Sequence, residues 1–127
     1  MSELPIKNEV RQPFLTITER VVGKTIILDL NGHITVSKGG LYTLQDKINS
    51  LIEAKKTNLI LNMENVPFID SHAIGALVGI LTKITNRNGK LILLNPGNRT
   101  LDLLEISNLK PVFTIYSNEQ EAVSSFD

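Results

Sequence analysis

The chain has 127 residues, of which 42% are hydrophobic, and this length suits one domain with a single core. Its 13 basic and 13 acidic residues give a formal net charge of zero, which argues against nucleic acid as the main partner because binding to phosphates needs a basic surplus. The chain has no cysteine, which excludes disulfides and thiolate metal sites, and no apolar run approaches the roughly 20 residues of a membrane span.

The first part of the chain predicts an arm followed by a β-hairpin. Residues 1–12 are polar, so we expect a flexible N-terminal arm ahead of one domain at 13–127. Two runs rich in β-branched residues, at 14–22 and 25–30, flank Gly23 and predict a hairpin, because glycine supplies the turn between the strands. The arm lacks the apolar segment of a signal peptide, so we expect a cytoplasmic protein.

A helix and an interior strand are predicted after the hairpin. Asn31-Gly32 is expected to end the second strand, and residues 33–36 could extend as a short strand or form a loop. Leucine and isoleucine recur at helical spacing from 41 to 52, which predicts an amphipathic helix facing the core. The continuous apolar run 59–61 is typical of a strand that is covered on both faces.

The second half of the chain alternates helices with strands. Gly75 and Gly79 lie near the apolar stripe of the helix predicted after Ser71, where small residues let a helix lie close to a sheet or another helix. Strands alternating with helices imply parallel pairing and right-handed crossovers. The predicted elements are a helix stripe of Ile74, Leu77, Val78, Leu81 and Ile84, a strand at 91–94, a short helix capped by Asn98 or Thr100 that carries Leu101, Leu104 and Ile106, a strand at 112–115 and a last helix opened by the capping-box pattern 117–120.

The most informative stretch is 66–76, VPFIDSHAIGA. A buried-looking apolar run that includes Phe68 and Ile69 stops at Asp70 and Ser71, and a helical pattern begins immediately afterwards. Ser71 is thereby placed at or beside a helix N-terminus, where unpaired N–H groups and the positive end of the helix dipole favour negative charge. We interpret Ser71 as a switch residue that accepts a phosphoryl group. The alternative is that Ser71 only caps the helix.

Patterns typical of enzymes and metal sites are missing. His33 and His72 belong to no HxxxH, HxH or HExxH pattern, so we expect no zinc site. Neither GxGxxG nor GxxxxGK[ST] occurs, so we expect no standard dinucleotide or P-loop site. Ser71 lacks the GxSxG elbow, and adjacent serine and histidine residues rarely form a catalytic pair. We therefore expect a protein that is not an enzyme and has no cofactor.

The stretch 58–79, NLILNMENVPFIDSHAIGALVG, resembles the central signature of the STAS domain of bacterial anti-sigma factor antagonists. In that signature an apolar strand leads to D-S-[ST]-G-[LI]-G and a helix of small and apolar residues. The tail 103–123 is similar to the ending of that family, so the resemblance spans roughly 14–126. It implies an α/β STAS-type fold: a mixed sheet of about four to five strands with an N-terminal hairpin, and about four helices packed mainly on one face.

The resemblance also implies a function by partner switching. In that family the unphosphorylated domain binds an anti-sigma factor that is itself a serine kinase. This binding releases the sigma factor. Phosphorylation of the serine directly after the motif aspartate, here Ser71, ends the interaction, and a phosphatase of the PP2C type restores it. The implied partner-binding residues are Asp70 and Gly75 in the motif, His72 beside the acceptor, and Thr35, Asn95 and Pro96 in the loops that face the partner.

Four positions depart from the family pattern. His72 replaces the usual hydroxyl residue, Ala73 replaces a glycine, Thr35 replaces the acid of G-x-[LI]-D, and Asn108 replaces a glycine of the tail. We expect the changes at Thr35 and His72 to alter which kinase is recognised.

Two other functions are compatible with the same resemblance. The domain could be a constitutive STAS scaffold subunit of a signalling or membrane-transport complex, with Ser71 acting only as a cap, or a sensor that binds a small molecule or nucleotide. We expect the free protein to be a monomer, to bind no nucleic acid directly and not to insert into membranes.

Overall fold

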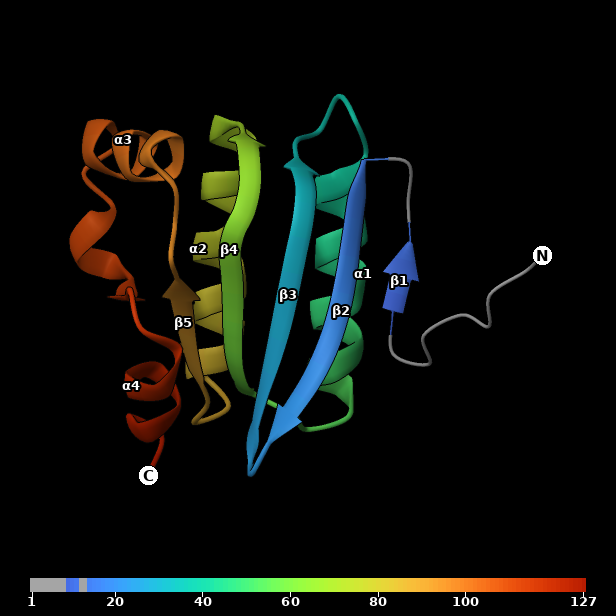
Figure 1. Cartoon of the computed structure of the whole chain (residues 1–127), viewed down its shortest axis with the longest axis vertical. Coiled ribbons are helices and arrows are strands. Elements are labelled where there is room, and N and C mark those ends of the chain that lie inside the picture. The colour runs from blue at the N-terminus through green and yellow to red at the C-terminus, as the bar shows by residue number, and fades with distance from the viewer. Residues whose placement is uncertain (1–8, 12–13) are drawn as a thin grey trace.

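In the computed structural model, which describes residues 9–11 and 14–127, a six-stranded sheet with the order β1-β2-β3-β4-β5-β6 forms the centre of the molecule (Figure 1). β1, β2 and β3 pair antiparallel, whereas β3, β4, β5 and β6 pair parallel, so the expected mixed sheet is confirmed. The strands are β1 (Glu9–Arg11), β2 (Leu15–Val22), β3 (Thr25–Ile34), β4 (Asn58–Ile69), β5 (Lys90–Leu94) and β6 (Thr114–Tyr116). The helices are α1 (Gly40–Glu53), α2 (Ser71–Thr85), α3 (Asn98–Ile106), the short 3-10 helix η1 (Lys110–Val112) and α4 (Glu119–Ser124).

The N-terminal hairpin is present as β2 and β3, joined at Gly23. The arm predicted at 1–12 lies outside the described residues except for 9–11, which pair with β2 as the edge strand β1. This three-residue strand brings the sheet to one strand more than the four to five expected.

The expectation that Asn31-Gly32 ends the second strand is wrong, because β3 continues to Ile34. Gly32 has a φ of +127°, a conformation that other residues rarely adopt, and a Cβ there would lie 2.1 Å from the carbonyl oxygen of Phe14. The close approach of the two backbones lets His33 N donate to Phe14 O at 2.6 Å. The glycine therefore bends the strand without ending it, and the pairing with β4 shifts register here.

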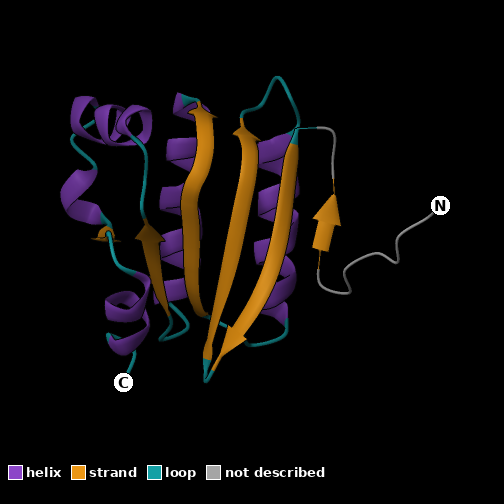
Figure 2. Cartoon of the chain, in the orientation of Figure 1, coloured by secondary structure: helices purple, strands orange, loops and turns teal. Residues whose placement is uncertain are grey.

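Two apolar layers hold the sheet. α1 and α2 lie on one face (Figure 2) and bury the larger core, whereas α4 covers part of the other face with a smaller cluster around Ile27, Ile60 and Ala122. The helices therefore pack mainly on one face, as expected. The largest fully buried side chains are Leu15, Ile17, Ile27, Leu28, Leu30, Ile34, Leu44, Ile48, Leu59, Ile60, Leu61 and Met63.

The stripe predicted on α2 is correct in part. Ile74, Leu77 and Ile84 are buried as expected, but Val78 and Leu81 are only half-buried. Gly75 and Gly79 face outward, and a Cβ added to either would meet no atom within 4 Å. They therefore do not serve close packing inside the molecule, contrary to the interpretation of the sequence.

The strand predicted at 112–115 begins later than expected. Pro111 lies in η1, and β6 starts at Thr114. Proline fixes φ near −65° and has no N–H to donate to a strand neighbour, which favours the 3-10 turn over an earlier start of the strand. Phe113, between the two elements, is buried in the larger core.

Candidate functional site

Ser71 lies at the end of the sheet where β3 and β4 finish. Ile34 pairs with Ile69, so Thr35 and Asp70 follow their strands at the same level. β5 is shorter, because its last residue, Leu94, pairs with Asn62 near the middle of β4. Asn95 and Pro96 therefore lie well below the end of β4. Thr35 and Val36, which follow β3, lie next to the start of α2, because Val36 N donates to Asp70.

Asp70 is the N-cap of α2. Its Oδ1 accepts a hydrogen bond from Ala73 N at 2.8 Å, and its Oδ2 accepts one from Val36 N at 2.9 Å. One carboxylate thus satisfies a free donor of the helix and fixes the loop that follows β3. The interpretation of Ser71 as the cap itself is wrong, because the cap lies one residue earlier.

Ser71 is the first residue of α2 and is exposed. Within the part of the chain that the structure describes, its hydroxyl has no hydrogen-bond partner. The sequence-based placement of a serine at a helix N-terminus is correct. The helix N-terminus that carries this hydroxyl favours a negative charge.

The outer side of α2 carries a strip of small side chains. Ser71, Gly75 and Gly79 follow one another at intervals of four residues, a spacing that aligns them along one side of a helix. All three are exposed, and so is His72, the second residue of the helix. The strip of Ser71, Gly75 and Gly79 therefore leaves part of the α2 backbone uncovered by large side chains.

Arg99 reaches this site from α3 and was missed by the sequence analysis. It is the second residue of α3, and its Nε donates to the carbonyl oxygen of Ile69 at 3.2 Å. Ile69 is the last residue of β4 and precedes Asp70 and Ser71. No periodic pattern indicates such a contact, because it depends on where α3 lies above the shorter β5.

An exposed aromatic cluster was also missed. The ring of His33 lies 4.6 Å from that of Phe68 and 6.0 Å from that of Phe14, between ring centroids, and Lys38 Nζ lies 4.8 Å from the centroid of Phe14. The prediction that Phe68 is buried is wrong, since it is 52% exposed. β4 continues as a strand to Ile69, so side chains alternate and Phe68 faces away from the core that buries Ile69.

An ion cluster between α4 and the sheet has a structural role. Arg20 pairs with both Asp29 and Glu119, and Asn62 donates to Asp29, which ties α4 to the sheet. The hydrogen bonds from Glu119 and Asp29 raise the pKa of Arg20 above its ordinary value. Burial raises the pKa of Asp29, but hydrogen bonds from Arg20 and Asn62 outweigh it and hold that pKa below the ordinary value. The hydrogen bond from Arg20 likewise lowers the pKa of Glu119.

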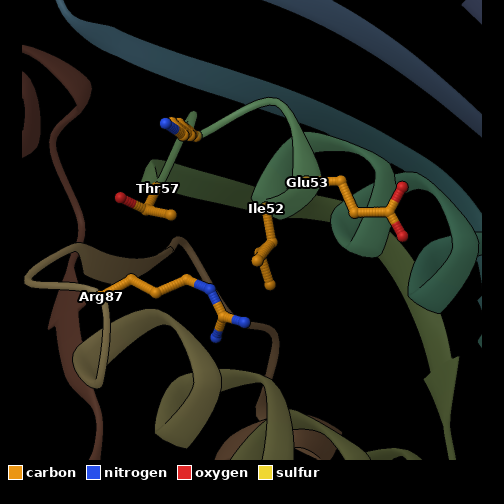
Figure 3. Close-up of a pocket in the computed structure, with 5 residues that line it drawn as sticks. Ile52, Glu53, Thr57 and Arg87 are labelled. Atoms are coloured by element: carbon orange, nitrogen blue, oxygen red, sulfur yellow. The ribbon is translucent and has the colours of Figure 1, made fainter.

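A hollow of about 550 Å³ lies at the opposite end of the sheet, where α1 and α2 finish (Figure 3). Ile52, Glu53, Thr57 and Arg87 line it together with Lys55. It shares no residue with the surroundings of Ser71, so it is separate from the candidate site. Within the described ranges, 9–11 and 14–127, no three side chains of His, Asp or Glu gather as metal ligands would, and no helix is both long and apolar enough to cross a bilayer.

Comparison with known proteins identifies the family. The family model of the STAS domain matches residues 13–122. The chain belongs to the STAS domain family. It is similar to the anti-sigma F factor antagonist of Lysinibacillus sphaericus, with 26% identity over 106 residues that cover 83% of this chain and 88% of the relative.

Solved structures of STAS proteins share the fold. The Bacillus cell fate determinant SpoIIAA in its phosphorylated form superposes with a TM-score of 0.68 and 25% identity, covering 87% of this chain and 99% of that one. An anti-sigma factor antagonist from Mycobacterium paratuberculosis superposes with a TM-score of 0.77 and 16% identity, covering 91% and 97% of the two chains. The arrangement of strands and helices around Ser71 is thus that of a STAS domain.

Two departures from the STAS signature lie in the first turn of α2. Ala73, in place of the usual glycine, is fully buried while its N–H donates to Asp70. His72, in place of the usual hydroxyl residue, is exposed. The first change is therefore accommodated inside this STAS domain, and the second alters its surface.

Proposed function

We propose that this STAS domain is an anti-sigma factor antagonist that acts by partner switching and is not an enzyme. In the unphosphorylated state it binds an anti-sigma factor that is a serine kinase, and phosphorylation of Ser71 releases that partner. The observation that carries the proposal is the Ser71 hydroxyl, which is exposed and unpaired among the described residues at a helix start fixed by Asp70. Similarity to proteins named anti-sigma factor antagonists supports it.

The exposed strip of Ser71, Gly75 and Gly79 on α2 supports close contact with a partner. A glycine in the interior of a helix costs about 1 kcal/mol relative to alanine. Gly75 and Gly79 carry this cost although no atom of the described chain would meet a Cβ at either position. A partner whose surface lies directly against the backbone of α2 provides a reason for both glycines, and it would place Ser71 inside the interface.

The phosphate would act through its charge. Phosphorylation adds close to two negative charges at pH 7. Inside an interface that encloses Ser71, these charges would be costly to desolvate and would be repelled by the phosphates of a nucleotide bound to a kinase. About 2.7 kcal/mol of lost interaction corresponds to a hundredfold loss of affinity. A PP2C-type phosphatase acting on the exposed Ser71 would restore binding.

The proposal is tested by calorimetry with the cognate kinase-type anti-sigma factor and nucleotide. We expect Ser71→Ala to bind like the wild type, and the protein carrying phosphoserine at 71 to bind at least about 100-fold more weakly. Ser71→Asp should weaken binding less, since aspartate carries one charge. Ser50→Asp, on the exposed side of α1, is the matched control and should not change the affinity. Equal affinities for all forms contradict switching.

Mass spectrometry of the protein from its own cells separates the switching function from the scaffold. A phosphopeptide containing Ser71 that appears or disappears with stress supports partner switching. A stable stoichiometric complex in which Ser71 is never modified supports a constitutive scaffold instead.

A further inference from the structure

We propose that Arg99 binds the phosphoryl group of phosphorylated Ser71 within the same chain. The inference rests on the proposed function, because it concerns the phosphorylated state of that site. Arg99 makes this contact only in the phosphorylated form. The contact joins the start of α3 to the start of α2.

The position of Arg99 carries the proposal. Its Nε is 3.2 Å from the carbonyl oxygen of Ile69, and Ser71 follows Ile69 by two residues. Two residues of extended chain span about 7 Å, and the two terminal amines of a guanidinium lie beyond Nε. The hydrogen bond to Ile69 therefore holds a cation within a side chain's reach of a group attached to Ser71.

Arg99 has donors to spare. An arginine carries five N–H donors in a planar fork, and the bond to Ile69 uses the one on Nε. Among the described residues, no carboxylate pairs with Arg99. Its four remaining N–H groups can therefore bind two oxygens of a phosphoryl group while Nε keeps its bond to Ile69, and bidentate pairs of this kind are among the stronger charge-assisted hydrogen bonds.

A cation beside Ser71 offsets the charge that a phosphate adds next to Asp70. The neighbouring carboxylate of Asp70 is held in place by Ala73 N and Val36 N, so it cannot turn away from the new negative charges. The helix N-terminus supplies only a partial positive charge, and Ala73 N is already used by Asp70. Lys38, in the loop after β3, is positioned over the ring of Phe14. Arg99 is thus the cation that a backbone hydrogen bond already holds beside this segment.

The experiment compares phosphorylated and unphosphorylated protein, with phosphoserine placed at 71 during synthesis of the chain. Thermal unfolding is measured for wild type, Arg99→Gln and Arg87→Gln. Arg87 is the matched control, because it also donates to a backbone carbonyl, that of Lys83, but at the far end of α2. We expect phosphorylation to lower Tm by about 3 °C more in R99Q than in the wild type, and equally in R87Q and wild type.

The effect of phosphorylation on Tm is compared between R99Q and the wild type, so the contribution of Arg99 to the stability of the unphosphorylated fold is subtracted. The bond to Ile69 is lost in R99Q in both phosphorylation states, so it cancels. As an independent readout, the side-chain Nε–Hε NMR signal that R99K removes should shift on phosphorylation, whereas those of Arg20 and Arg87 should not. Equal Tm losses in R99Q and wild type with an unmoved signal overturn the proposal, and so does a coupling seen with His72→Gln but not with R99Q. Because the phosphate is introduced chemically, these results do not depend on any kinase or partner.

Discussion

Asp70 determines the local geometry at Ser71, because one side chain makes two hydrogen bonds to different parts of the backbone. The bond to Ala73 N caps α2, and the bond to Val36 N fixes the loop after β3. Each of its oxygens accepts one of these bonds, so the carboxylate is held in one orientation. Its role at the site is to hold the position of Ser71.

We predict that Asp70→Ala costs about 2 kcal/mol of unfolding free energy, because it removes a cap and leaves a half-buried N–H without a partner. Asn118→Ala, which removes only the cap of α4, should cost about 1 kcal/mol. Urea titrations of both variants check the difference. A loss no larger than that of Asn118→Ala would show that the second hydrogen bond of Asp70, to Val36 N, contributes nothing.

The two sides of α2 have different surroundings. α2 buries Leu77 completely, whereas Leu81 is only partly covered and packs at the margin of the core. Its opposite side presents Gly75 and Gly79 to the surroundings. One side of this helix is therefore fixed by packing inside the molecule, and the other is free to meet a partner.

We expect Leu77→Ala to cost about 2–5 kcal/mol in a denaturant titration, as deletions at fully buried positions do. Leu81→Ala should cost clearly less, because part of the side chain already contacts solvent. The pair is measured under the same conditions. Equal losses would mean that Leu81 belongs to the core and not to its margin.

A substitution at Gly75 separates the stability of the free protein from its affinity for a partner. Gly75→Ala should stabilise the free protein by about 0.5–1 kcal/mol, because alanine favours a helix and its Cβ meets open space. The same change should weaken binding to the kinase-type partner if that partner lies directly on the helix. Unfolding and calorimetry on the same samples test both effects. Gly32→Ala is the contrasting variant and should destabilise, because its Cβ would meet Phe14 O.

For the molecule as a whole, the Arg20 cluster couples α4 to the sheet in a pH-dependent way. Hydrogen bonds hold the pKa values of Asp29 and Glu119 below their ordinary values, so the unfolded chain binds more protons in acid than the folded one. The resulting stability is present at neutral pH and is lost as pH falls below about 4.

We predict that Arg20→Met lowers the unfolding free energy at pH 7 by about 1 kcal/mol, a small value because the three side chains are between 31% and 43% exposed. At pH 3 the difference from the wild type should shrink. Lys110→Met, which removes the more exposed pair with Glu105, should have little effect at either pH. A difference that is constant with pH would show that Arg20 acts through packing alone.

The local pattern was sufficient to predict most of the fold and the centre of the site. The alternation of apolar runs with helical stripes gave the order of the elements, and the change of pattern at Asp70 placed Ser71 at the start of a helix. Local rules alone did not decide between Asp70 and Ser71 as the cap, because both side chains are good N-caps.

Tertiary structure decided what lies around Ser71. Phe68 is exposed because β4 extends to Ile69, and Asn95 lies away from the site because β5 ends at the level of Asn62. Arg99 reaches Ile69 because α3 follows the shorter strand. These contacts depend on relative strand lengths and register, which are fixed by packing across the sheet. By itself the sequence therefore determined the residue that carries the proposed switch, and the folded sheet determined which charge lies beside it.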